Sequence, residues 1–251
     1  MIIFLKTEEE IEGFRKAGLF AGQVLKKVLD SVEVGVTTKY LDELARKECE
    51  VLQVKPVFLG HEGYPAVICA SNNFTLVHGL PNDEKLKAGD VLSIDVGVEV
   101  DGFIGDTADT IIVGESFQET NKHNLLRACR LALQKAILEA KDGNKLSNIS
   151  AQIYKTAKEN NYSVPVEYGG HGINRYAMHA DPFISNIPYE NEDITLKYGM
   201  IIAIEPMFIN GNNPKTSVGK DGWGVIVSDL SAHCEHTVLV GQKSGVVLTQ
   251  R

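Results

Sequence analysis

The chain has 251 residues, and 43% of them are hydrophobic, which is enough to form the core of one large domain or two small ones. It carries 25 Lys and Arg residues against 33 Asp and Glu residues, a formal net charge of −8, and no block of five like charges. This balance argues against a general nucleic-acid surface or an anionic-membrane surface and suits small substrates or neutral peptides better.

The N-terminal stretch and the cysteines indicate a cytoplasmic protein. The opening MIIFLKTEEE has a short apolar run but no basic region before it and no A-x-A cleavage site, and no segment approaches the ~18 apolar residues of a membrane span. Cysteines at positions 49, 69, 129 and 234 form no CxxC pair, which favours reduced thiols over a disulfide framework or a zinc finger.

The first half of the chain predicts two helices followed by strands. Thr7 and Glu10 form a capping-box pattern before a helix over residues 9–30, and Thr37 or Thr38 caps a second helix that ends near Val51. The apolar stripe of the first helix comprises Ile11, Phe14, Leu19, Val24, Leu25 and Val28. Short strands are expected over residues 66–71, 75–79, 91–100 and 103–114.

The second half repeats this order. Helices are predicted over residues 119–141 and 147–159, and strands near 164–168, 200–206, 223–229 and 235–240. The stretch LKAGDVLSID at 86–95 reappears as LKYGMIIAIE at 196–205, an offset of 110, while Gly35 and Gly143 lie 108 apart. We infer a duplicated α+β unit, over roughly residues 8–113 and 117–242, in which a pseudo-two-fold brings Asp95 and Glu205 to one cleft. No Pro-rich or Ser-rich linker separates the halves, so residues 1–251 are interpreted as a single domain.

A predicted hairpin brings two acids to one face of a sheet. Asp101-Gly102 is a strong two-residue turn signal, and a turn centred there places Gly97 opposite Asp106 and Asp95 diagonal to Asp106. Neighbouring carboxylates repel each other, so this pairing suggests a bound cation. A register shift of one residue would separate the two acids.

Three further residues extend this group. Glu205 and Glu235 lie in apolar runs without a nearby Lys or Arg, where an unpaired carboxylate is costly, and His171 lies between glycines in YGGHGIN. Any one of these acids would also suit a solvated strand position, but together they indicate a site for two divalent ions such as Mn, Fe, Co or Zn. The chemistry expected of such a pair is hydrolysis by a metal-bridging hydroxide. HExxH, GxSxG, Walker A and GxGxxG patterns do not occur, and nothing motivates a Cys nucleophile.

Five separated motifs resemble those of type I methionine aminopeptidases, in order and over essentially the whole chain: VHG at 77–79, SIDVGVEVDGFIGDTADT, GGHGI, AIEPM and CEHT. The resemblance implies the pita-bread fold, a duplicated helix-helix-strands unit around a metal pair. It implies that Asp106 and Glu235 bridge the two metals and that His78 and His179 contact the substrate amide. The implied ligands are Asp95, Asp106, His171, Glu205 and Glu235.

The resemblance also implies the reaction, which is removal of the N-terminal methionine from nascent proteins and peptides with a small second residue. Glu205 would carry the proton to the leaving nitrogen, and His179 would stabilise the oxyanion. The expected partner is the N-terminus of a nascent polypeptide, with the ribosome as a candidate contact, no nucleic-acid function, and a monomeric enzyme. The pocket for the first side chain would comprise Phe58, Tyr64, Cys69, Met178 and Trp223, although Phe58 and Met178 suit a core position equally well.

The sequence departs from this pattern at GGHGINRYAMHADP. Seven residues rather than six separate His171 from His179, HADP replaces HExP, Asn174 replaces a small residue, and His61 stands where a tyrosine is frequent. The position of His179 is therefore the least determined. A prolidase or Xaa-Pro aminopeptidase would share the five ligands but usually carries an additional N-terminal domain, and an inactive relative that binds RNA or protein would tend to lose ligands.

Overall fold

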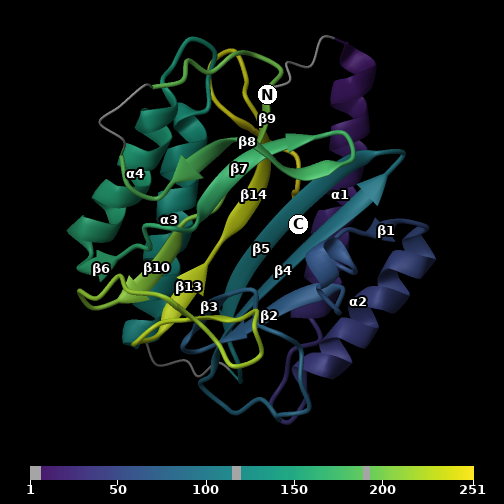
Figure 1. Ribbon diagram of the computed structural model, residues 1–251, viewed down its shortest axis with the longest axis vertical. Coiled ribbons are helices and arrows are strands. Elements are labelled where there is room, and N and C mark those ends of the chain that lie inside the picture. Colours follow the sequence, from purple (N-terminus) through teal and green to yellow (C-terminus); the bar gives the residue numbers. More distant parts are fainter. Residues whose placement is uncertain (1–6, 115–119, 189–192) are drawn as a thin grey trace.

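The computed structural model describes residues 7–114, 120–188 and 193–251. The N-terminal stretch before Thr7 and the predicted helix start at Glu119 lie outside these ranges. Two helical hairpins lie at opposite sides of the view in Figure 1, with the strands between them. One hairpin comprises α1 (Glu8–Leu29) and α2 (Thr38–Leu52), and the other α3 (Asn121–Glu139) and α4 (Leu146–Glu159). None of the helices in the described ranges has the length and apolarity that a bilayer span requires.

The predicted helix caps are present. The Thr7 hydroxyl accepts from the backbone N–H of Glu10 at 3.1 Å, and the Thr37 hydroxyl accepts from Tyr40 at 3.1 Å, so each satisfies a donor that the first helical turn leaves free. The α1 stripe is wrong at Leu19, which is 48% exposed. The buried face of α1 instead includes small residues. At Gly22 the helix packs so closely against the C-terminal segment that an added Cβ would lie 2.2 Å from the Gln250 carbonyl oxygen.

One large antiparallel sheet forms the centre of the molecule. Its strands run in the order β1-β4-β5-β14-β9-β7-β8, β2 also pairs with β4, and β15 pairs with β14. Two three-stranded sheets, β13-β10-β6 and β11-β12-β3, accompany it. The strands are β1 (Lys55–Pro56), β2 (Ile68–Asn72), β3 (Thr75–Val77), β4 (Val91–Val100), β5 (Phe103–Ile112), β6 (Tyr162–Ser163), β7 (Gly169–Asn174), β8 (Ala177–Ser185), β9 (Ile201–Ile204), β10 (Met207–Asn210), β11 (Ser217–Val218), β12 (Val225–Ile226), β13 (Ser231–His233), β14 (Glu235–Leu239) and β15 (Val246–Val247).

Several strand predictions in the second half are wrong. Residues 164–168 form no strand, the predicted strand near 223–229 is reduced to the two-residue β12, and the sequence did not predict β7, β8 or β10. Strand β7 escaped notice because it is rich in glycine. Those glycines permit close strand contact, since a Cβ at Gly170 or Gly172 would lie 2.2 Å or 2.0 Å from a backbone oxygen of the neighbouring strand.

The two halves repeat the same backbone hydrogen bonds. Gly35 N–H donates to the Leu86 carbonyl at 2.8 Å, and Gly143 N–H donates to the Leu196 carbonyl at 2.9 Å. Leu86 and Leu196 each return a bond of 2.8 Å to the residue after that glycine. Gly35 and Leu86 in the first half correspond to Gly143 and Leu196 in the second half. A duplicated unit predicts that these two pairs form the same hydrogen bonds. The boundaries of the halves and the single-domain assignment stay predictions.

Substitution of Gly22 by Ala tests the close contact of α1. Alanine is ordinarily the better helix residue by about 1 kcal/mol, yet here its Cβ meets the backbone of Gln250. We expect Gly22→Ala to reduce the free energy of unfolding by roughly 1–3 kcal/mol, as overpacking does. Urea denaturation measures this, and Gln23→Ala, at the exposed neighbouring position, should lie within about 0.5 kcal/mol of wild type. A Gly22→Ala protein more stable than wild type would contradict the prediction.

Candidate active site

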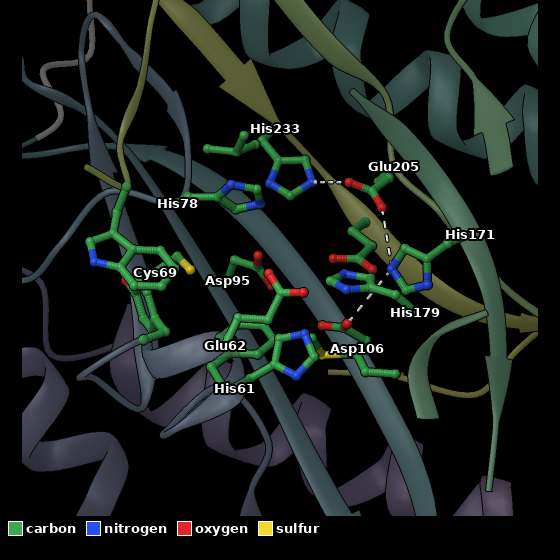
Figure 2. Close-up of a pocket in the computed structure, with 16 residues that line it drawn as sticks. His61, Glu62, Cys69, His78, Asp95, Asp106, His171, His179, Glu205 and His233 are labelled. Carbon is green, nitrogen blue, oxygen red and sulfur yellow. Dashed lines mark ion pairs between the residues drawn. The ribbon is translucent and has the colours of Figure 1, made fainter. Parts of the chain in front are cut away.

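All twelve predicted site residues line one cavity of about 140 Å³ (Figure 2). The two halves of the chain contribute to it together, because the β4–β5 hairpin belongs to the first half and the β7–β8 hairpin, β9 and β14 belong to the second. The predicted residues in the lining are Phe58, Tyr64, Cys69, His78, Asp95, Asp106, His171, Met178, His179, Glu205, Trp223 and Glu235.

The predicted register of the first hairpin is confirmed. Gly97 lies opposite Asp106 and Asp95 opposite Ala108, so the two aspartates are diagonal neighbours on one face of the sheet. Asp101 and Gly102 form the turn with positive φ angles of 53° and 84°. Glu235, the first residue of β14, pairs with Ala108 from the other side and so joins the aspartates at the centre of the sheet.

The carboxylates lack partners for their charge. Asp95 Oδ1, Asp106 Oδ1 and Glu235 Oε1 are buried and have no hydrogen-bond partner among the residues that the structure describes. Burial raises the pKa of Asp106 to about 7. Burial and the charge of Asp106 raise the pKa of Asp95 and of Glu235 well above the ordinary range, and burial and the charge of Asp95 do the same for Glu205. No Lys or Arg stands among the described residues that line the cavity.

His171 presents an imidazole lone pair to this group. Its Nδ1 lies 3.1 Å from the Gly172 carbonyl, which can only accept, so Nδ1 carries the proton and Nε2 is free to bind a cation. Nε2 lies 3.5 Å from Glu205 Oε1 and 4.0 Å from Asp106 Oδ2. Burial, followed by the charge of His179, lowers the pKa of His171 to about 3, which keeps the ring neutral.

These donors fit a divalent ion. One ligand atom each from Asp106, His171 and Glu235 lie within 4.8 Å of one another, and Asp95 and Glu205 stand beside them in the cavity. Oxygen donors with one imidazole suit ions such as Mn, Fe, Co and Zn. A cation would also satisfy the carboxylate oxygens that the protein itself leaves without partners.

The extra residue before His179 does not remove it from the cavity. The β7–β8 register shifts twice, since His171 pairs with Phe183, Gly172 with Ala180 and Asn174 with Ala177. These irregularities accommodate the additional length in β8. The ring centroid of His179 lies 4.4 Å from that of His171. Figure 2 shows the two side chains next to each other in the cavity.

The tip of the β7–β8 hairpin is tied to the tip of the β4–β5 hairpin. Tyr176 N–H donates to the Gly102 carbonyl at 2.9 Å, and the Arg175 guanidinium donates to the Asp101 carbonyl at 3.0 Å. The Arg175 guanidinium also lies 4.5 Å from the ring centroid of Phe103. The hairpin that carries the two histidines is therefore anchored to the hairpin that carries the two aspartates.

The residues predicted for the side-chain pocket form a largely apolar part of the lining of the same cavity. Tyr64 and Trp223 meet edge to face at 5.1 Å, and the Tyr64 hydroxyl lies 3.0 Å from the Gly79 carbonyl, which fixes its ring. Gly97 leaves room for Phe58, since a Cβ there would lie 2.9 Å from the Phe58 ring. Phe58 and Met178 both belong to a buried apolar cluster and line the cavity, so the core and pocket interpretations hold together for them.

Sequence reasoning did not assign four residues of the lining: His61, Glu62, Val77 and His233. His61 lies on the short helix η1 (His61–Gly63), and its ring meets that of His179 at 5.4 Å. His233 ends β13, and its Nε2 lies 3.4 Å from Glu205 Oε2. The sequence signal for His233 was its position two residues before Glu235, which is too common a spacing to single it out.

A larger groove adjoins the cavity. Its volume is about 750 Å³, and it shares His78, His171, His179 and Glu205 with the smaller cavity. His78 and His179 stand where the two spaces meet, and both are exposed. The small cavity and the larger groove thus adjoin each other along these four shared residues.

Comparison with known proteins decides the family, because the model of metallopeptidase family M24 matches residues 12–242. The chain belongs to metallopeptidase family M24. It is 42% identical over 261 residues to a methionine aminopeptidase of Aquifex aeolicus, with 100% of both chains covered. It is 38% identical over 255 residues to the methionine aminopeptidase of Escherichia coli K12, with 100% of this chain and 95% of that protein covered.

Solved structures of M24 proteins confirm the predicted pita-bread fold. The crystal structure of methionine aminopeptidase from Thermotoga maritima superposes with a TM-score of 0.94 at 37% identity and covers 100% of both chains. Prolidase from Pyrococcus furiosus gives a TM-score of 0.79 at 21% identity, and the match spans 99% of this chain but 66% of the prolidase. The likeness to prolidase concerns the fold alone.

The raised carboxylate pKa values predict that cation binding depends strongly on pH. Below about pH 7 Asp106 holds a proton that a cation must displace, so the affinity should fall with falling pH, by about tenfold per unit for each proton released. Calorimetric titration of the metal-free protein with Mn²⁺ at pH 6, 7 and 8, in two buffers of different ionisation enthalpy, measures both affinity and proton release. An affinity that stays constant from pH 6 to pH 8 would contradict the prediction.

Proposed function

We propose that this M24 protein is a methionine aminopeptidase, which removes the N-terminal methionine from peptides and nascent proteins whose second residue is small. The observation that carries this proposal is a single small cavity whose lining combines unpartnered carboxylates with the apolar side chains of Phe58, Met178 and Trp223. A chamber of this size accepts one side chain, and the adjoining groove receives the rest of the peptide. The names of the full-length relatives support the same reaction.

The metal ligands in this proposal are Asp95, Asp106, His171, Glu205 and Glu235. Their number and their placement on both halves suit a pair of divalent ions, with Asp106 and Glu235 shared between them. The ions, when bound, supply Lewis acidity toward the scissile carbonyl and lower the pKa of a coordinated water. Carboxylate oxygens with one imidazole suit Mn, Fe, Co and Zn equally, so the donor set narrows the ions to these four.

The protein groups position the substrate and move the proton. Glu205 accepts a proton from the attacking water and delivers it to the leaving nitrogen, because its carboxylate faces the centre of the cavity beside His171. His179 donates a hydrogen bond to the developing oxyanion, and His78 holds the scissile amide where the chamber opens into the groove. The chamber, lined by Tyr64, Cys69 and Trp223 and by Phe58 and Met178, binds the methionine side chain.

Specificity follows from the shape of the site. An unbranched thioether can follow a narrow chamber in which a leucine branch meets the wall early. A small second residue keeps the scissile bond close to the carboxylates, whereas a bulky one holds it away. In this proposal the enzyme acts as a monomer on N-termini in the cytoplasm, where polypeptides leaving the ribosome supply its substrate.

A peptide series tests the proposed function. After chelation and re-addition of Mn²⁺ or Co²⁺, Met-Ala-Ser and norleucine-Ala-Ser should be cleaved, and Leu-Ala-Ser should have a kcat/KM roughly 10 to 200-fold lower because its branch does not fit. Met-Leu-Ser should resist cleavage. Release of the first amino acid is measured by chromatography. Equal rates for the methionine and leucine peptides would reject the pocket assignment, and preferential cleavage of Ala-Pro would favour the prolidase alternative.

Substitution of His179 tests its role at the oxyanion. His179→Ala should lower kcat for Met-Ala-Ser on the order of 10²-fold, because a donor aimed at the transition state is lost. Metal content by mass spectrometry should stay at the wild-type value, since His179 is not among the proposed ligands. An unchanged kcat would reject the role, and loss of metal together with activity would indicate that His179 is a ligand instead.

A further inference from the structure

Glu205 lies between two imidazoles, one at each carboxylate oxygen (Figure 2). His171 Nε2 is 3.5 Å from Oε1, and His233 Nε2 is 3.4 Å from Oε2. His171 belongs to the proposed ligand set, but nothing in that set accounts for His233. The sequence places His233 only two residues before Glu235, and the fold turns its side chain toward a different carboxylate.

His233 is a buried polar residue whose ring nitrogen lacks a proper partner. The residue is 2% exposed, and within the described parts of the chain Nε2 makes no hydrogen bond of good geometry. A buried imidazole nitrogen without a partner is costly, so a residue in such a place requires an explanation. The Glu205 carboxylate oxygen is the acceptor that Nε2 faces, and a movement of a few tenths of an ångström would bring the 3.4 Å separation into the range of a hydrogen bond.

Hydrogen bonds to Thr110 hold the backbone of His233 in place. Its N–H donates to Thr110 Oγ1 at 2.9 Å, and the same hydroxyl donates to the His233 carbonyl at 2.7 Å. Ser93 Oγ lies 2.8 Å from Thr110 Oγ1, so hydroxyls of β4 and β5 together hold the backbone of β13. These hydrogen bonds hold the backbone of His233 rigidly, which suits a residue whose side chain positions another side chain.

We propose that His233 is a positioning residue that donates a hydrogen bond from Nε2 to Glu205 Oε2. The bond would hold Oε1 toward His171 and the proposed cation site, so that Glu205 can bind an ion and carry a proton through a defined oxygen. The neutral ring with its proton on Nε2 suffices for this. Burial, with the charge of His78 second, lowers the pKa of His233 to about 3, which is consistent with a neutral donor.

The inference rests on the proposed function for the role of Glu205, but its effect on cation binding can be measured without turnover. His233→Leu removes the N–H donor and introduces an apolar side chain of similar bulk. His233→Gln retains an N–H donor. The metal-free wild type and both variants are titrated with Mn²⁺ by calorimetry, and kcat and KM are then measured with Met-Ala-Ser. Thermal denaturation of each protein verifies folding.

His233→Leu should bind Mn²⁺ about 10 to 100-fold more weakly and lose kcat with little change in KM, as removal of a group that orients a metal ligand does. His233→Gln should restore both quantities close to wild type. Wild-type behaviour of the Leu variant would overturn the positioning role. A Gln variant as defective as the Leu variant, with fewer ions bound, would overturn it too, because His233 would then be a direct ligand.

A double-substitution cycle covers the case in which His233→Leu folds poorly. His233→Met replaces it as the apolar variant, and either change is combined with Glu205→Gln. If His233 acts through Glu205, the second change should weaken Mn²⁺ binding little further, and additive losses would overturn the inference. A wild type that binds Mn²⁺ but leaves Met-Ala-Ser intact would reject the proposed function alone, since the effect of His233 on binding would still be measured.

Discussion

Mutual repulsion of four carboxylates in one cavity is the constraint on which the rest of this structure depends. Asp106, Glu205 and Glu235 are at most 8% exposed, and their oxygens face each other without a Lys or Arg in the described lining of the cavity. Burial raises the pKa of Asp106 to about 7, and burial together with the charge of Asp106 raises the pKa of Asp95 and of Glu235 well above the ordinary range. Such a cluster persists in a folded protein when the surrounding sheet holds it and either protons or a bound cation balance its charge.

The sheet supplies that rigidity through side-chain hydrogen bonds between β5 and β14. The Asp106 N–H donates to Thr237 Oγ1 at 2.8 Å, and the Thr237 hydroxyl donates back to the Asp106 carbonyl at 2.8 Å. Thr107 Oγ1 donates to the Glu235 carbonyl at 2.9 Å. These bonds join β5 to β14 and so hold the carboxylates of two distant segments in one place despite their repulsion. The hydroxyls belong to the architecture of the site although they do not line it.

In the proposed function, the two adjoining spaces bind different parts of the substrate. Tyr64 and Trp223 pack edge to face in the lining of the small cavity, and His78 and His179 lie where this cavity meets the groove. A peptide would place its first side chain in the chamber and its remaining residues along the groove. In this proposal the apolar part of the cavity lining, rather than the carboxylates, sets the substrate preference.

The sequence by itself determined the parts of the site that depend on local pattern. Alternation over residues 91–112 and the Asp101-Gly102 turn set the register that brings Asp95 and Asp106 to one face, because side-chain direction in a strand has a period of two. The repeated stretch ending in Asp95 and Glu205 indicated the duplication, and the family motifs indicated the ligands. Strands β7, β8 and β10 were missed because glycine-rich and polar segments carry little periodic signal.

Only the tertiary structure decided how distant segments meet. His179 reaches the cavity through register shifts in the β7–β8 hairpin, which no count of residues between two histidines could foresee. His233 faces Glu205 rather than solvent because β13 pairs with β10, which begins two residues after Glu205. Leu19 is exposed because the buried face of α1 includes glycine and alanine on another side of the helix. Contacts of this kind depend on the relative placement of whole strands and helices. They follow from burial and close packing over the entire chain, which a local pattern of residue types does not contain.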